Sequence, residues 1–329
     1  MFLKKKIITF LILLITLVTI IICFKNNKDN NNLTRIKLAE VTHSVFYAPL
    51  YVAIENGYFE NVGIDLEVIL TPGADKVSAA VLSNTVDIGF AGTESAIYIY
   101  SGGEEDYLVT FAGLTKRDGQ FIVSRNCDKE FKLTDLYNKE ILVGRTGGMP
   151  SLNFINAMKN SKIDISKIDV NYSIDFASLS GTFIGGIGDY VNLFEPTATT
   201  VVKASNSCIV ESIGKLSGEM PYTAFYTRKS YLANNKELLK DFTNAINKGL
   251  DFVKNNDSKT IAKIILPQFP DSSLNDIKIN IDNYKKYDSW LENPYINESS
   301  FENLQDILLD NKLIEKRTPY SKLINNLYE

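Results

Sequence analysis

Several strand-like segments of the chain are followed directly by residues of the kinds that bind small polar ligands. The alternating segment 86–90 runs into Gly92, Thr93 and Glu94, after which a helix is expected. A glycine allows close approach of a ligand to the backbone, a hydroxyl donates or accepts, and a helix start offers free N–H groups. The order therefore indicates a ligand cradle, in which Glu94 either caps the helix or binds a ligand ammonium or amidine group.

Two further junctions have the same character. The strand 141–144 is followed by the turn that contains Gly147, Gly148 and Met149, and then by a helix from residue 150. Its N–H groups are candidates to hold an anionic group, with a plain tight turn as the alternative; no Gly-Lys-Ser/Thr follows, so it is not a Walker loop. Glu195 lies at a later strand-to-helix junction, after the strand 190–194, and has the same two interpretations as Glu94, helix cap or ligand for a cation.

Two polar turns complete the candidate ligand residues of the middle of the chain. The turn after the strand 108–112 contains Thr115, Arg117 and Asp118, which are either a solvated turn or part of a ligand cleft. Gly73 follows Pro72 in a turn before a helix, where Asp75 lies near the helix N-terminus. Both signs of charge are thus expected around one cleft.

The elements that position these residues begin with a βαβ unit at residues 35–68. A strand at 35–41 leads into the loop 42–47, a helix then starts around Pro49 and stops at Gly57, and a second strand covers 64–68. Ligands of parallel sheets collect outside the carboxyl ends of the strands. Phe46 and Tyr47 in this loop are therefore expected to form a pocket wall, and His43 is a weaker candidate.

The pattern then restarts, which indicates a second α/β domain. Strands and helices alternate from about residue 133 to 210, a strand at 222–226 returns to the first domain, and the remainder is helical, with Tyr222 expected in the core. We predict a two-lobed α/β clamshell with crossings near 115–121 and 220–225. The predicted divisions are 1–33 for the leader and linker, 34–121 with 223–329 for the first domain, and 122–222 for the second.

The N-terminus has the features of an export signal or a membrane anchor. MFLKKK precedes an apolar run from residue 7 to 24 and a polar tract rich in Asn and Lys. Cys23 stands where a lipoprotein would be acylated, although Ile20, Ile21 and Ile22 replace the expected small residue. We expect the folded part to be tethered at the extracytoplasmic face of the cell membrane, by acylated Cys23 or by an uncleaved helix.

Composition and residue counts exclude several functional classes. The net charge of −4 and the lack of a nucleic-acid-binding motif argue against nucleic acid as a partner. The single histidine and the absence of CxxC and HExxH patterns argue against a His-containing metal site, and no cofactor is expected. Export permits a disulfide between Cys127 and Cys208, but one pair is not a disulfide framework, so unpaired small core residues are the favoured interpretation.

Three segments together resemble a known family. FYAPLYVAIENGYFENVGIDLEVI, ADKVSAAVLSNTVDIGFAGTESAIY and VNLFEPTA are similar to the solute-binding proteins of ABC importers in the nitrate, sulfonate and taurine group (the NMT1/THI5-like family), whose relatives include binding proteins for thiamine-pyrimidine precursors. The resemblance covers roughly residue 35 to the C-terminus. It implies a type II periplasmic-binding-protein fold that closes on a small-molecule ligand and docks onto ABC permease and ATPase subunits.

The charges at the expected cleft favour a ligand that carries both signs. A bare anion such as nitrate does not need Glu94 and Glu195, so we expect a zwitterionic sulfur-containing solute such as taurine or cystine, with Arg117 and Glu195 as complementary anchors. The alternative is an aminopyrimidine thiamine precursor. The family also includes pyrimidine synthases with a CCCFC motif, which this chain lacks, so we do not expect an enzyme.

Overall fold

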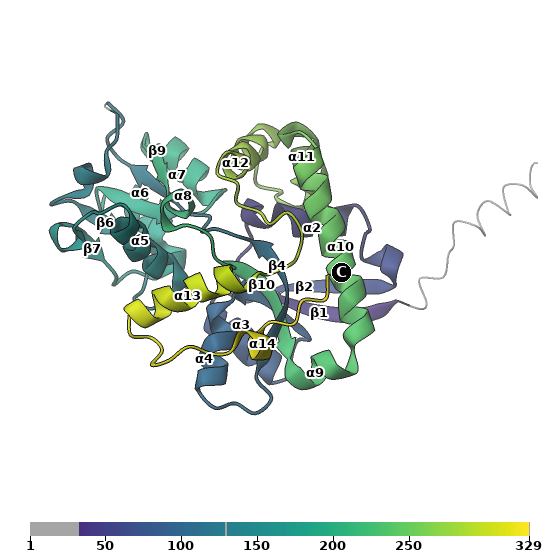
Figure 1. The fold of residues 1–329 in the computed structure, drawn as a ribbon. Helices are drawn as coiled ribbons and strands as arrows, with labels where there is room; N and C mark the ends of the chain where they lie inside the picture. The colour runs from purple at the N-terminus through teal and green to yellow at the C-terminus, as the bar shows by residue number, and fades with distance from the viewer. Residues whose placement is uncertain (1–32, 129, 329) are drawn as a thin grey trace, which may run out of the picture.

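The chain folds around two five-stranded sheets (Figure 1). The structure, a computed structural model, describes residues 33–328 except residue 129. Sheet A has the order β2-β1-β3-β10-β4 and sheet B the order β7-β6-β8-β5-β9. Sheet A consists of β1 (Thr34–Glu40), β2 (Ile64–Leu70), β3 (Ile88–Gly92), β4 (Leu108–Thr115) and β10 (Thr223–Arg228). Sheet B consists of β5 (Phe121–Ser124), β6 (Glu140–Leu142), β7 (Asp169–Asn171), β8 (Tyr190–Leu193) and β9 (Cys208–Ser212).

The expected βαβ unit opens sheet A. β1 pairs in parallel with both β2 and β3, while β10 runs antiparallel between β3 and β4. Helix α2 (Ala48–Glu55) carries Pro49 in its first turn, where the missing N–H of proline costs no intrahelical hydrogen bond. The loop before it is a short 3-10 helix, η2 (Val45–Tyr47). The carboxyl ends of β1 and β3 therefore lie at the same edge as η2.

Each sheet has apolar cores on both faces. Sheet B is covered on one face by α5 (Met149–Asn160) and α8 (Ile213–Ser217), and on the other by α6 (Leu179–Ile184) and α7 (Thr197–Ser205). Sheet A is covered on one face by α2 and the C-terminal helices, and on the other by α3 (Ala74–Leu82) and α4 (Glu94–Ser101). We call sheet A with its helices the first lobe, and sheet B with its helices the second.

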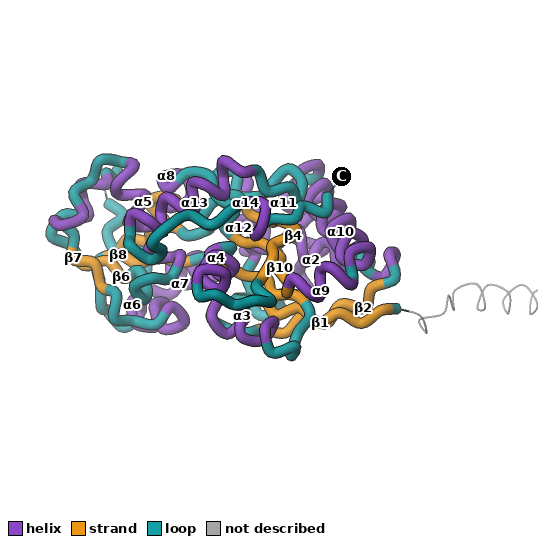
Figure 2. Tube along the Cα trace, turned by 60° about the horizontal axis from the view of Figure 1, so that its bottom comes forward, coloured by secondary structure: helices purple, strands orange, loops and turns teal. Residues whose placement is uncertain are grey.

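The C-terminal part is helical, as expected. Its helices are α9 (Lys229–Asn234), α10 (Lys236–Asn255), α11 (Ser258–Ile265), α12 (Leu274–Lys286), α13 (Glu298–Asp310) and α14 (Tyr320–Leu323). α10 buries Leu239, Phe242, Ile246, Leu250 and Val253 at helical spacing. Two of these helices also reach the second lobe, because α12 lies beside α7 and α13 beside α5 (Figures 1 and 2).

Two connections join the lobes and run side by side. The segment after β4 pairs with the segment before β10, since the N–H groups of Met220 and Tyr222 donate to the carbonyl oxygens of Lys116 and Thr115 over 3.0 and 3.1 Å. The loop after α12 supports the first connection from the other side, where Lys116 N–H donates to the Ser289 carbonyl over 3.0 Å. The chain leaves and re-enters sheet A as predicted, while the residue boundaries of the two domains stay a prediction.

Cys127 and Cys208 correct one expectation, because they form a disulfide. Their Cα atoms are 5.9 Å apart, and the bond joins the end of β5 to the start of β9. The sequence interpretation as unpaired core residues was wrong because it used residue counts only, whereas β5 and β9 are antiparallel neighbours that pair Ser124 with Cys208. Such a bond is typical of oxidising compartments.

The predicted anchor lies outside the described residues. This applies to the signal or membrane segment and to the acylation of Cys23. Between residues 33 and 328, no helix is both long enough and apolar enough to cross a bilayer.

Candidate functional site

Polar side chains without hydrogen-bond partners are gathered at the junction of the two lobes. Among the described residues, buried oxygen or nitrogen atoms lack a partner on thirteen residues, which include Arg117 and Tyr98. Six of the thirteen lie at strand ends, in the helix turns that follow them or on the connection between the lobes, namely Thr93, Glu94, Asp118, Gln120, Asn153 and Asn192. All six side chains are 5% exposed or less. Buried polar groups in folded proteins are normally paired, since each unpaired group costs about 1–3 kcal/mol. We call these six residues the junction cluster.

Glu94 comes from the first lobe, at the start of α4. Its carboxylate folds back over the Cα atom of Gly92, so tightly that a Cβ atom at position 92 would overlap its oxygens. Burial raises the pKa of Glu94 to about 7. No ion pair to Glu94 is present among the described residues, so its ionised form is unbalanced.

Asp118 comes from the first connection and is also buried. One of its oxygens accepts from Gln120 N–H over 2.6 Å, and its carbonyl lies against Gly214 of α8, where any larger residue would overlap it. The neighbouring Gly119 is in contact with the ring of Phe46. Burial raises the pKa of Asp118 to about 8, which the hydrogen bonds from Gln120 and Tyr222 only partly offset.

Two tyrosines connect these carboxylates. Burial raises the pKa of Tyr47 and of Tyr222, and the negative charges of Glu94 and Asp118 raise both further. Both tyrosines are 5% exposed or less, and Phe46 lies between them with ring centroids at 5.6 Å from Tyr47 and 6.0 Å from Tyr222. Glu94, Asp118, Tyr47 and Tyr222 therefore form one acidic site with an aromatic wall.

The second lobe contributes amides to the same junction. Gln120 precedes β5 and Asn192 lies near the end of β8, on the face of sheet B that α5 covers. Asn153 lies in the second turn of α5, where its Nδ2 donates to the Met149 carbonyl over 3.1 Å and its Oδ1 has no partner. Since α5 starts at the carboxyl end of β6, these amides lie at the edge of sheet B that faces the first lobe.

The lobes are closed over this junction. Met149 and Leu152 of α5 are almost fully buried and pack against the core of the first lobe. Phe194 of the second lobe contacts Phe46 and Tyr222, with ring centroids at 5.6 and 6.3 Å.

Two predicted anchors have other partners. The Arg117 guanidinium donates to Glu219 over 2.6 Å, and Asp288 is 3.8 Å away. Glu195 is buried, and its oxygens accept from Thr199 N–H, the Thr199 hydroxyl and Asn283 Nδ2 over 2.8 to 2.9 Å. Glu195 is therefore engaged with the protein, and Arg117 is engaged through its terminal guanidinium nitrogen, while Arg117 Nε is buried without a partner. The assignment of both residues as ligand anchors remains a sequence prediction.

The remaining predicted residues divide in the same way. The junction cluster includes Thr93, Glu94 and Asp118, and it is bordered by Gly92, Phe46, Tyr47 and Met149. Thr115 Oγ1 accepts a hydrogen bond from Thr223 N–H over 2.9 Å. His43 contacts Glu40 at 3.3 Å and the Gln268 carbonyl at 2.8 Å instead. Gly73 forms the N-cap of α3, Gly148 is exposed at the N-cap of α5, and no described contact joins them or Gly147 to the cluster.

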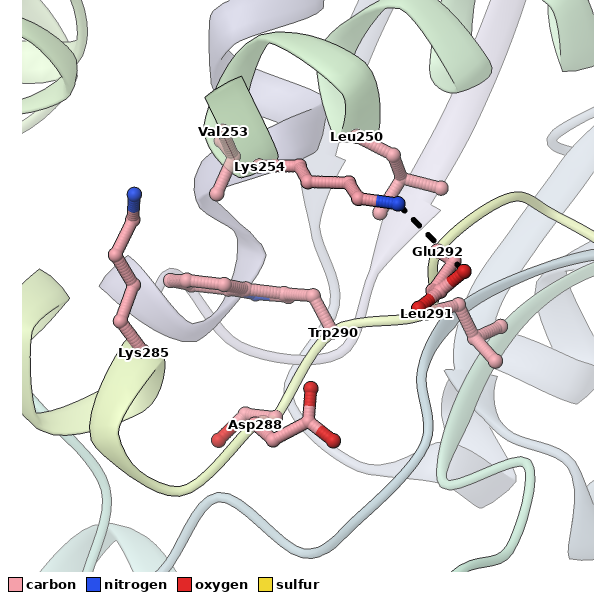
Figure 3. A pocket seen from close by; sticks show the side chains of 9 residues that line it. Leu250, Val253, Lys254, Lys285, Asp288, Trp290, Leu291 and Glu292 are labelled. Carbon is pink, nitrogen blue, oxygen red and sulfur yellow. Dashed lines mark ion pairs between the residues drawn. The ribbon is translucent and has the colours of Figure 1, made fainter. Parts of the chain in front are cut away.

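Two surface cavities lie outside the junction cluster. One of about 250 Å³ is lined by Trp290, Lys254 and Lys285, and Lys254 pairs with Glu292 at 3.6 Å beside it (Figure 3). The Trp290 indole N–H donates to the Phe46 carbonyl over 2.7 Å, so this single tryptophan braces the aromatic wall. The other cavity, of about 420 Å³, lies between α5, the second connection and α13.

Sequence analysis missed Gln120, Asn153 and Asn192. Its expectation that Tyr222 lies in the core is confirmed, and the negative charge of Asp118 acts on the hydroxyl of this tyrosine. A signal was present for Asn192, which interrupts the otherwise apolar strand YVNL. Asn153 similarly lies on the apolar face of α5, between Leu152 and Phe154. A polar residue in a buried, apolar position is a stronger indicator of a site than a charge in a turn.

Comparisons with known proteins agree with this architecture. Residues 45–260 match the family model described as NMT1/THI5 like. The chain is 41% identical over 299 residues to the "Putative binding protein YtlA" of Bacillus subtilis (strain 168), across 91% of this chain and 90% of that protein.

Solved structures show the same fold at low identity. The periplasmic aliphatic sulphonate binding protein SsuA of Escherichia coli superimposes with a TM-score of 0.69 at 13% identity, over 88% of this chain and 97% of that chain. The alkanesulfonate-binding protein SsuA of Xanthomonas axonopodis pv. citri, bound to MOPS, gives 0.69 at 13% identity, over 89% and 98%. A ligand-binding component of an ABC-type import system from Staphylococcus aureus gives 0.67 at 13% identity, over 90% and 98%.

These findings confirm the predicted α/β periplasmic-binding-protein fold. They also agree with the expectation of a binding protein rather than an enzyme. The chain belongs to the NMT1/THI5-like family.

Proposed function

We propose that the protein is the extracytoplasmic solute-binding component of an ABC importer, and that its two lobes close on a small organic solute with a positively charged nitrogen. Family membership, the 41% identical relative and the shared fold support the binding role. The Cys127–Cys208 disulfide supports an oxidising, extracytoplasmic location. ABC permease and ATPase subunits are the expected partners, and the N-terminal segment or acylated Cys23 is the expected tether.

The observation that carries the solute class is the pair of buried carboxylates. Glu94 and Asp118 have no basic partner among the described residues, and the surrounding amides and hydroxyl also have unused hydrogen-bonding atoms. A buried charge is stabilised chiefly by an opposite charge and by hydrogen bonds. A ligand ammonium, amidinium or protonated ring nitrogen supplies both.

Two kinds of solute satisfy this requirement. A zwitterionic sulfur compound such as taurine or cystine places its ammonium at the carboxylates. An aminopyrimidine thiamine precursor places its amino group there and stacks against Phe46, Tyr47 or Tyr222. A simple alkanesulfonate or nitrate has neither a positive charge nor a hydrogen-bond donor that could interact with the two carboxylates.

A thermal-shift screen with the full-length protein in detergent tests this proposal. The panel contains taurine, cystine, an aminopyrimidine, ethanesulfonate and nitrate, and a solute at about 100 times its Kd should add about 2.7 kcal/mol to the free energy of unfolding. We expect at least one of the three amine-bearing compounds, namely taurine, cystine or the aminopyrimidine, to raise Tm in the wild type and to raise it less in Glu94→Gln. The solute class would be contradicted by a larger Tm shift from ethanesulfonate or nitrate, or by the lack of any shift from taurine, cystine and the aminopyrimidine.

A further inference from the structure

A second buried polar cluster joins the lobes away from the acidic site. Helix α12 packs against α11 and η2 in the first lobe. It also lies beside α7 of the second lobe (Figure 1), and its polar side chains bond to residues of the β8–α7 segment. At this contact Asn283 Nδ2 donates to Glu195 Oε1 and Asn280 Nδ2 donates to Thr199 Oγ1, each over 2.9 Å. Every one of these bonds crosses from one lobe to the other.

The backbone of Glu195 is held from the first lobe as well. Its N–H donates to the Tyr284 hydroxyl over 2.9 Å, and its carbonyl accepts from the Ser44 hydroxyl over 2.5 Å. Glu195, Asn280 and Tyr284 are all fully buried. Both the side chain and the main chain of Glu195 are thus bound by the first lobe only while the lobes are closed.

Ser44 links this contact to the acidic site. Its Oγ accepts from Phe46 N–H over 3.1 Å and so caps η2, which carries Phe46 and Tyr47. The Tyr284 ring also lies against Phe46, with centroids 5.0 Å apart. The same two residues that hold Glu195 therefore hold the aromatic wall that borders Glu94 and Asp118.

We propose that Ser44, Asn283 and Tyr284 are positioning residues, which determine solute affinity by stabilising the closed lobes through Glu195 and do not contact the solute. We call these residues with Glu195 the interlobe latch. The latch goes beyond the proposed function, because closure can be measured without any solute. It gives Glu195, whose carboxylate already accepts three hydrogen bonds from the protein, a role in affinity that needs no contact with the solute.

The same pair of helices offers a matched control. Lys203 of α7 and Asp276 of α12 also form an interlobe ion pair, at 2.5 Å, but the Lys203 side chain is 57% exposed. Exposed ion pairs contribute little, with a median near 0–1 kcal/mol, whereas a hydrogen bond to a buried charge contributes more. The latch therefore predicts different effects for Asn283→Ala and Lys203→Ala.

Single-molecule fluorescence transfer in the full-length protein, without solute, tests the latch. Fluorophores are attached through non-natural amino acids at the exposed positions Lys162 and Lys236, one in each lobe, so that the native cysteines are left alone. We expect Asn283→Ala and Tyr284→Phe each to shorten the dwell time of the closed state about tenfold or more. Lys203→Ala should change it less than threefold.

Three results would overturn the proposal. These are an unchanged closed dwell time in both latch variants, an equal effect of Lys203→Ala, and lobes that never open in any variant. Circular dichroism confirms that each variant is folded, so that a lost closed state is not mistaken for unfolding. A solute panel that gives no binding would contradict the proposed solute class and leave this measurement intact.

Discussion

Glu94 and Glu195 occupy comparable places in the two lobes but have opposite surroundings. Each follows a strand, β3 or β8, at the start of a helix, and each is buried. The Glu195 oxygens accept three hydrogen bonds, whereas Glu94 Oε2 has no partner among the described residues. A satisfied carboxylate stabilises the protein and an unsatisfied one is available to a ligand, so we propose that the same local motif serves structure in one lobe and recognition in the other.

The largest expected difference is in stability. Glu195→Ala leaves Asn283 and Thr199 without their acceptor and should lower the free energy of unfolding by about 3 kcal/mol at pH 8. Glu94→Gln removes an unbalanced buried charge and should leave this free energy unchanged or raise it. Urea denaturation measures the free energy of unfolding of both variants. If Glu94→Gln is as destabilising as Glu195→Ala, the two glutamates do not differ as described.

The next largest effect concerns solute binding. Glu94→Gln and Asp118→Asn should each weaken binding of the best nitrogen-bearing solute by about ten- to a hundred-fold, since hydrogen bonds to charged groups contribute about 1.5–3 kcal/mol. Calorimetric titration measures this. Ser101→Ala, at the exposed C-terminal end of α4, is the control and should retain wild-type affinity within about threefold. If Glu94→Gln and Asp118→Asn both bind with wild-type affinity, Glu94 serves only as a first-turn residue of α4 and does not bind the solute.

The pH dependence of stability sharpens the comparison further. Glu94 and Asp118 have folded pKa values of about 7 and about 8, above their ordinary values, so the folded protein binds protons more tightly than the unfolded chain. The free energy of unfolding of the solute-free protein should therefore fall as pH rises from about 4 to about 8, by about 2 kcal/mol or more.

Two other groups contribute to this slope with the same sign. Burial raises the pKa of Glu195, and the bond with Glu40 raises the pKa of His43. The informative quantity is thus the difference between wild type and Glu94→Gln, measured by denaturation at several pH values. The variant should have the shallower decline, and equal slopes would show that Glu94 is not buried as an unbalanced acid.

The smallest expected effect is at Arg117. Its guanidinium pairs with Glu219 and lies near Asp288, whose side chains are 48% and 65% exposed. Arg117→Ala should therefore change solute affinity less than about threefold. A tenfold loss in calorimetry would restore the sequence prediction that Arg117 anchors an anionic end of the solute.

The sequence was informative where local pattern determines structure. Apolar periodicity located the strands and helices of both lobes. A strand-to-helix junction indicated Glu94 and the polar turn of the first connection indicated Asp118, and both side chains are buried between the lobes. Glu195 shows the limit of this reasoning. Its partner Asn283 lies 88 residues downstream on α12, so nothing in the local motif distinguishes it from Glu94. The disulfide was missed for the same reason, because its two cysteines are 81 residues apart.

Proton release on binding tests the central claim most directly, namely that Glu94 and Asp118 receive a cationic solute. At pH 7 Asp118 is largely protonated and Glu94 about half protonated in the solute-free protein, and a bound cation lowers their pKa values. Calorimetry of the best nitrogen-bearing solute in buffers of different ionisation enthalpy should show release of about one proton per solute, reduced in Glu94→Gln and in Asp118→Asn. Proton uptake, or binding with no exchange of protons in the wild type, would contradict the account.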